Sequence, residues 1–161
     1  ISPVPAMLAA GVNVGLGTDG AASNNDLDLW EEIRMADLLH KVASGDATAL
    51  PAQQALAMAT RLGAGAVRLG DSVGQLKVGM QADIIQLQLG ATHQQPLYDV
   101  VSHLVYVMDS TDVVTTVVAG KVLMQDRQVQ TIDEQALRQS VAKTSNEIRS
   151  ALRETPAPAS E

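Results

Sequence analysis

The stretch from Gly15 to Asp28 places the strongest constraint on how this chain can fold. An apolar run, Val12 to Leu16, leads into small and polar residues around a single carboxylate, Asp19, and a helical pattern follows directly. This order predicts a strand, a turn and a helix, with Asp19 at the carboxyl end of the strand. In parallel α/β folds the loops converge and ligands bind at that end, so Asp19 is a candidate functional residue.

The same residues also fit a simpler interpretation. Asp followed by Gly is common in turns, and Asp19 would then only bond to its own backbone. Ser23, Asn24 and Asn25 lie close enough in sequence to shape the mouth of a site, but loop and N-cap chemistry is the simpler explanation for them. The residue pattern alone leaves both interpretations open.

The amino-acid sequence of the whole stretch favours the functional interpretation. The letters GVNV from Gly11 and GTDGAASNNDLD from Gly17 resemble the last barrel strand and loop of the amidohydrolase superfamily. The nearest branch is that of the 5-methylthioadenosine and S-adenosylhomocysteine deaminases, with their triazine-hydrolase relatives. A second stretch, GQLKVGMQAD from Gly74, is similar to the signature at which amidohydrolases return from the barrel to a small β-sandwich.

This resemblance implies an α/β fold: the last part of a metal-dependent hydrolase (β/α)₈ TIM barrel, part of a composite β-sandwich and a C-terminal helix. We expect residues 1–70 in the barrel, 71–132 in the sandwich, 133–154 in the helix and 155–161 in a disordered tail. A complete barrel takes about 250 residues. With 161 residues, the chain is therefore expected to be a carboxyl-terminal fragment.

The resemblance also implies a chemistry. Members of the family hydrolyse C–N bonds with the help of a divalent metal. By analogy Asp19 is catalytic, binds the metal, contacts the substrate, and carries a proton from the attacking water towards the departing ammonia. We expect one metal ion, with Zn²⁺ the first choice. The family's metal-binding histidines and catalytic glutamate have no matching positions here, so the isolated polypeptide is expected to be inactive.

The implied substrate is a small purine nucleoside such as 5-methylthioadenosine or S-adenosylhomocysteine, which loses ammonia. A triazine- or guanine-type aminohydrolase of the same superfamily is an alternative, because substrate choice depends on loops outside this chain. A structural or interaction remnant, or one half of a split enzyme, is a further alternative. A homo-oligomer is left open for the full-length enzyme.

Composition and net charge limit the classes of partner that this chain is expected to bind. A net charge of −7 and a pI near 4.8 argue against nucleic acid and anionic membranes, because both need clustered cations. No leader segment and no apolar run of about 20 residues is visible, and cysteine is absent. We therefore expect a soluble, cytoplasmic protein. His93 and His103 lack the close pairing of a metal motif, and His40 near a helix end is expected to be solvated or capping.

Helical patterns are expected at 4–10, from Asp26 to Gly45, and from 51 to 69. In the long middle helix Met35, Leu38, Leu39 and Val42 fall at helical spacing, which predicts a stripe that packs against a sheet.

From Gly74 the pattern predicts a hairpin entering a strand with one buried face, and Asp83 is expected to make a turn or backbone hydrogen bond. Strands are expected at 113–119, 121–125 and 128–130. Asp133 should cap a final helix that carries one apolar face.

Overall fold

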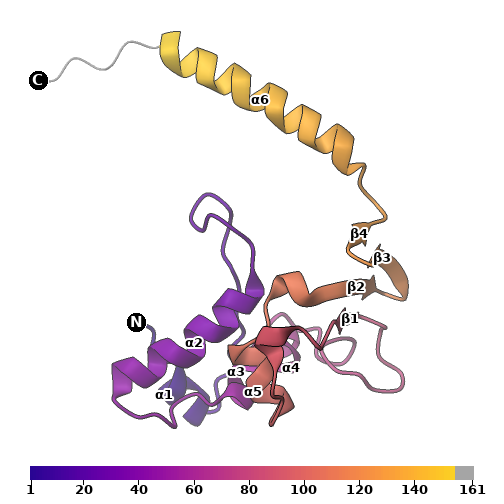
Figure 1. Ribbon diagram of the computed structural model, residues 1–161. Helices are drawn as coiled ribbons and strands as arrows, with labels where there is room; N and C mark the ends of the chain where they lie inside the picture. Colours follow the sequence, from indigo (N-terminus) through magenta and orange to yellow (C-terminus); the bar gives the residue numbers. More distant parts are fainter. Residues whose placement is uncertain (155–161) are drawn as a thin grey trace, which may run out of the picture.

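The computed structural model describes residues 1–154, and the expected disordered tail at 155–161 lies outside them. A group of helices lies beside a small antiparallel sheet, and a long terminal helix projects from the sheet (Figure 1). Within this range the helices are α1 (Val4–Ala9), α2 (Leu29–Ser44), α3 (Ala52–Ala59), α4 (Arg61–Ala66), α5 (Val100–Tyr106) and α6 (Glu134–Glu154). The strands are β1 (Ile84–Leu87), β2 (Val113–Val118), β3 (Lys121–Gln125) and β4 (Gln128–Val129). None of the helices described is long and apolar enough to cross a membrane.

Helix α2 ends at Gly45, as its sequence predicts, but it begins at Leu29, three residues after the predicted start at Asp26. The Asp28 carboxylate accepts a hydrogen bond from the Trp30 N–H at 2.8 Å, which satisfies one of the unpaired donors of the first turn. Gly45 closes the helix with a φ of 65°, a left-handed conformation that glycine adopts without strain. The Asp28 cap fixes the point at which the loop from Asp19 enters the helix.

The side of α2 that is buried differs from the predicted one. Met35, Leu38, Leu39 and Val42 are between 37% and 82% exposed, so the stripe does not pack against a sheet among the described residues. The buried residues instead lie at i, i+4 and i+7 on another face, and they are Ile33, Asp37 and His40. The expectation that His40 is solvated is therefore wrong, because this second face is the one that packs towards α3 and α5.

The core between α2, α3 and α5 is built from small and aliphatic side chains. Ile33, Ala52, Ala55 and Val105 are buried together. Partly buried residues pack around them, namely Leu16, Leu56, Ala59 and Val101. The chain contains no Phe, and this core is built from alanine and aliphatic side chains.

A row of polar side chains on α2 holds the end of α5. The Trp30 indole N–H donates to the Leu104 carbonyl at 2.6 Å. The Arg34 guanidinium donates to the carbonyls of Val105 at 3.1 Å and Met108 at 2.6 Å. The last carbonyls of a helix have no partners within the helix and favour a cation, so these contacts complete the end of α5.

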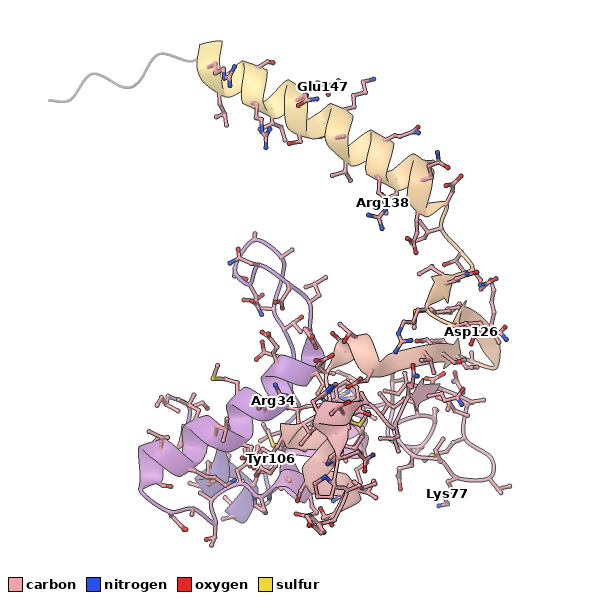
Figure 2. The ribbon with its side chains drawn as sticks, in the orientation of Figure 1. Arg34, Lys77, Tyr106, Asp126, Arg138 and Glu147 are labelled. Atoms are coloured by element: carbon pink, nitrogen blue, oxygen red, sulfur yellow. The ribbon has the colours of Figure 1, made fainter. Side chains whose placement is uncertain are left out.

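The same side of α2 also carries a buried carboxylate, Asp37. Asp37 is fully buried and accepts hydrogen bonds from the Tyr106 hydroxyl at 2.8 and 2.9 Å and from the Lys41 ammonium at 2.6 Å. Lys41 also donates to the carbonyls of Ala49 and Leu50, at 3.2 and 3.3 Å. The cluster of Asp37, Lys41 and Tyr106 therefore joins α2, α5 and the loop before α3. Tyr106 is labelled in Figure 2, close to Arg34 of α2.

The cluster raises the pKa values of two of its groups, Tyr106 and Lys41. Burial raises the pKa of the Tyr106 phenol, and its hydrogen bond to Asp37 raises it further. Burial disfavours the charged form of Lys41, but the hydrogen bond and charge of Asp37 outweigh this effect and raise the pKa of Lys41. Both groups therefore hold their protons more tightly in the folded chain.

Residues 12–20 contain neither helix nor strand, so the strand expected at Val12 to Leu16 is not formed. Within this segment Leu16 N–H bonds to the Met58 carbonyl at 3.2 Å. Gly15 lies so close to Gly63 that a Cβ on Gly15 would be 2.9 Å from the Gly63 Cα. A strand requires a hydrogen-bonded neighbour, and the part of the chain described here brings none alongside.

The sheet has the order β1-β2-β3-β4 with every pair antiparallel. The Asp83 carboxylate accepts a hydrogen bond from the Ala119 N–H at 2.6 Å, as expected for a residue at a strand start. The predicted hairpin from Gly74 is wrong, because residues 74–83 form turns and β1 pairs with the distant β2. Ile84 and Ile85 point to opposite faces and both stay exposed, so neither face of β1 is covered among the described residues.

Helix α6 stands away from the other helices (Figure 1). As predicted, Asp133 receives the Ala136 N–H at 3.0 Å at its start. Its predicted apolar face is exposed, and this face consists of Leu137, Val141, Ile148 and Leu152. On its polar face Arg138 forms an ion pair with Glu134 at 3.4 Å, and Glu147 forms one with Lys143 at 4.0 Å (Figure 2).

Replacing Tyr106 with Phe should lower the free energy of unfolding by about 1 kcal/mol, because the buried Asp37 carboxylate loses a donor. The unaltered chain should also lose stability as the pH rises above about 10. In the unfolded chain Tyr106 and Lys41 lose their protons at their ordinary pKa values of 10.0 and 10.5, whereas the folded chain still holds these protons. The Tyr106→Phe chain should show a shallower alkaline decline. Urea unfolding at several pH values measures both effects. Tyr98→Phe is the matched control, since Tyr98 is 91% exposed, and an equal loss there would contradict the assignment.

Hydrogen exchange should distinguish residues 13–19 from helix α2, which follows them. The N–H groups of residues 13–15 and 17–19 have no hydrogen-bond partner among the described residues, so they should exchange almost as fast as in an unfolded chain. The interior of α2 should be protected. Strong protection of residues 13–15 would show that the segment has found a strand partner, for example in a second copy.

Candidate functional site

Asp19 lies in the loop that leads to α2, within a stretch that forms neither helix nor strand. Its backbone adopts a φ of 59°, a left-handed conformation that is uncommon for residues other than glycine and that clusters at functional sites. One carboxylate oxygen, Oδ1, accepts the Gly20 N–H at 2.7 Å, and the Thr18 hydroxyl donates to the Asp19 carbonyl at 3.0 Å. The carboxylate is thus oriented by its neighbours and exposed to solvent.

The loop after Asp19 is organised by its own hydrogen bonds. The Gly20 carbonyl accepts the N–H groups of Ser23 and Asn24, at 3.0 and 2.9 Å. The Asn24 amide donates to the Thr18 carbonyl at 3.2 Å and to the Glu32 carboxylate at 3.1 Å. Asn24 therefore ties the loop to the first turn of α2, which is the loop chemistry that the simpler interpretation predicts for it.

The Asp19 carboxyl is held in its charged form. The Gly20 N–H lowers the pKa of this group below its ordinary value of 3.8, with a smaller contribution from the Ser23 hydroxyl. The Ser23 hydroxyl donates to the Gly20 carbonyl at 3.1 Å, so the backbone N–H is the contribution that the geometry supports best. At neutral pH Asp19 is a carboxylate that can accept a proton or bind a cation.

The other acidic residues near Asp19 accept hydrogen bonds that hold the loop and the start of α2. Asp26 accepts the Asp28 N–H at 3.2 Å, and Asp28 caps α2 and accepts the Ser110 hydroxyl. A cavity of about 570 Å³ lies between the start of α2, α3 and β1, but Asp19 does not line it.

Among residues 1–154, no group of three or more His, Cys, Asp or Glu side chains could hold a metal ion. The three histidines lie on separate elements: His40 on α2, His103 on α5, and His93 exposed in a 3-10 turn. Asp19 fits a metal site as a single ligand, because its carboxylate is charged and accessible. Structural and catalytic zinc sites use three or four protein ligands, so the described residues provide one ligand and not a complete site.

Comparison with known proteins identifies the family. The profile of the Amidohydrolase family matches residues 1–123, and the chain therefore belongs to this family. Its α/β architecture, with a four-stranded antiparallel sheet and a final helix, agrees with the fold class expected from the sequence.

Two curated relatives illustrate the similarity. The chain is 53% identical over 148 residues to a 5'-deoxyadenosine deaminase of Methanosarcina barkeri, a match that covers 92% of this chain and 34% of the relative. It is 53% identical over 137 residues to a 5-methylthioadenosine/S-adenosylhomocysteine deaminase of Pelotomaculum thermopropionicum, covering 85% and 31%. The chain thus spans about a third of the length of the curated relatives it matches.

Two solved structures are similar to this chain over about nine-tenths of its length. An adenosine deaminase from Xanthomonas campestris with bound zinc superimposes with a TM-score of 0.88 at 40% identity, covering 92% of this chain and 34% of that one. A triazine hydrolase variant superimposes with a TM-score of 0.77 at 32% identity, covering 91% and 32%.

An NMR titration of the Asp19 carboxyl carbon should give a pKa below 3.8. The value should stay below 3.8 in the Ser23→Ala chain, because the Gly20 N–H remains in place. Asn25→Ala, a change at an exposed position of the same loop, is the control. A return to the ordinary value in Ser23→Ala would show that the hydroxyl, and not the backbone, holds the charge.

Proposed function

We propose that this chain is the carboxyl-terminal part of a metal-dependent deaminase that hydrolyses the C–N bond of an adenosine-type nucleoside. The observation that carries the proposal is Asp19, an oriented and ionised carboxylate within a chain that is 53% identical to a 5'-deoxyadenosine deaminase. The zinc in the Xanthomonas campestris structure supports a divalent metal as cofactor.

Asp19 would serve as one ligand of that metal and as the proton carrier beside it. The metal supplies Lewis acidity, which activates water and polarises the carbon under attack. The Gly20 N–H keeps one carboxylate oxygen fixed, and the other oxygen has no hydrogen bond among the described contacts, so it is open to water or a cation. A carboxylate placed in this way can take a proton from water and give it to the leaving amine.

The division of the chain follows from the same proposal. Residues 1–70 would complete the barrel, 71–132 would belong to the β-sandwich and 133–154 would form the terminal helix. The change from helices to the antiparallel sheet between α4 and β1 supports the first boundary, and the Asp133 cap supports the last.

Relatives favour a nucleoside over a triazine as substrate. Identity to the deaminases named above reaches 53%, against 32% for the triazine hydrolase. We infer that 5'-deoxyadenosine or 5-methylthioadenosine is the class of substrate, and that the chain without further ligands is inactive.

The test is a fusion in which this chain replaces the matching third of the Methanosarcina barkeri relative. The fusion with zinc should release ammonia from 5'-deoxyadenosine or 5-methylthioadenosine, and Asp19→Asn should reduce the rate about 100-fold or more. Asp26→Asn, in the same loop, is the matched control and should retain the rate.

Two results would overturn the proposal. Zinc-dependent ammonia release by this chain alone would show that it needs no further ligands. An Asp19→Asn fusion as active as the unaltered fusion would remove Asp19 from the chemistry.

A further inference from the structure

The side chain of Asn24 links the loop around Asp19 to helix α2. Its amide nitrogen carries two N–H donors. This nitrogen donates to the Thr18 carbonyl at 3.2 Å and to the Glu32 carboxylate at 3.1 Å. Asn24 is partly buried, and Glu32 lies in the first turn of α2. A continuous set of contacts therefore runs from the residue before Asp19, across the loop, to the helix.

The contact with Thr18 holds the peptide group that leads into Asp19. The Thr18 carbonyl and the Asp19 N–H belong to one planar unit, so a hydrogen bond to this carbonyl restrains the whole unit. Beyond Asp19, the Gly20 carbonyl accepts the N–H groups of Ser23 and Asn24, at 3.0 and 2.9 Å. Asn24 thus restrains the backbone on both sides of Asp19.

Asp19 needs such restraint because its backbone conformation is uncommon. Its φ is 59°, and a residue other than glycine keeps a left-handed conformation only where its surroundings offset the cost. The hydrogen bond from the Gly20 N–H to Oδ1, at 2.7 Å, depends on the same conformation, since its donor belongs to the next residue. A rotation about φ would therefore turn the carboxylate relative to the chain that precedes it.

Glu32 is a suitable anchor because the start of α2 is itself fixed. Asp28 caps the first turn, and Ile33, the residue after Glu32, is 4% exposed in the core. Dense packing around Ile33 sets where Glu32 lies, independently of the loop. A functional group is held most precisely when its support stands on an element of this kind.

We propose that Asn24 and Glu32 are positioning residues for Asp19. Asn24 transmits the position of α2 to the peptide group between Thr18 and Asp19, and so sets the direction of the Asp19 carboxylate. Neither residue has to touch the substrate or the metal for this. The inference rests on the proposed function for the reaction in which that direction matters.

The first measurement is the rate of ammonia release by the zinc-loaded fusion with the Methanosarcina barkeri relative. Asn24→Ala and Glu32→Ala should each lower kcat about tenfold, because the supports of a metal-binding carboxylate contribute at least that much. The ratio kcat/KM should fall with kcat and leave KM nearly unchanged. The double variant should be no slower than the slower single variant, because both residues act through one contact.

Conservative and neighbouring changes separate positioning from general damage. Glu32→Gln keeps an oxygen that can accept the Asn24 amide, so it should retain most of the rate. Asn25→Ala and Glu31→Ala alter exposed neighbours of the two residues and are the matched controls, with kcat expected to be unchanged. Circular dichroism of each variant checks that α2 still folds.

The second measurement requires no activity and uses this chain alone. The scalar coupling between the amide proton and the Hα of Asp19 depends on φ. It should change in the Asn24→Ala chain, which loses the contact with Thr18, and stay the same in Asn25→Ala.

Three results would overturn the inference: an unaltered kcat in the Asn24→Ala fusion, losses that multiply in the double variant, or an unchanged coupling at Asp19 in the Asn24→Ala chain. A fusion without substitutions that releases no ammonia would instead refute the proposed function. The coupling at Asp19 would then decide the positioning role by itself.

Discussion

The buried carboxylate of Asp37 is the contact on which the helical part depends. It accepts hydrogen bonds from Tyr106 and Lys41, and so joins α2 to α5 and to the loop before α3. A buried ion pair is weak evidence for net stability, but removing one partner leaves an uncompensated polar group at large cost. The cluster therefore fixes which face of α2 turns inwards, and so leaves the apolar stripe of Met35, Leu38, Leu39 and Val42 exposed.

That choice of face also determines where Asp19 lies. The Asp28 cap fixes the start of α2, and Asn24 ties the preceding loop to Glu32 in the first turn. Asp19 is consequently held in the loop between residues 12–18, which form no strand, and the first turn of α2.

Local chemistry predicted several elements well. Gly45 marked the end of α2 and Asp133 the start of α6, because short-range hydrogen bonds decide those ends without help from the rest of the fold. The pairing of β1 could not be predicted in this way, because its partner β2 lies far along the chain. Gln94 shows the same limit, since it is buried and bonded to Asp112 at 2.8 Å without any local signal.

By itself the sequence determined the family, the position of Asp19 at a loop before a capped helix, and the helical spacing of apolar residues on α2. Periodicity cannot tell which of two faces of a helix is covered, because it records spacing and not neighbours. Only the tertiary structure decided that Ile33, Asp37 and His40 are buried and that the apolar stripe is left outside. The physical reason is that burial depends on which distant elements, here α3 and α5, reach the helix.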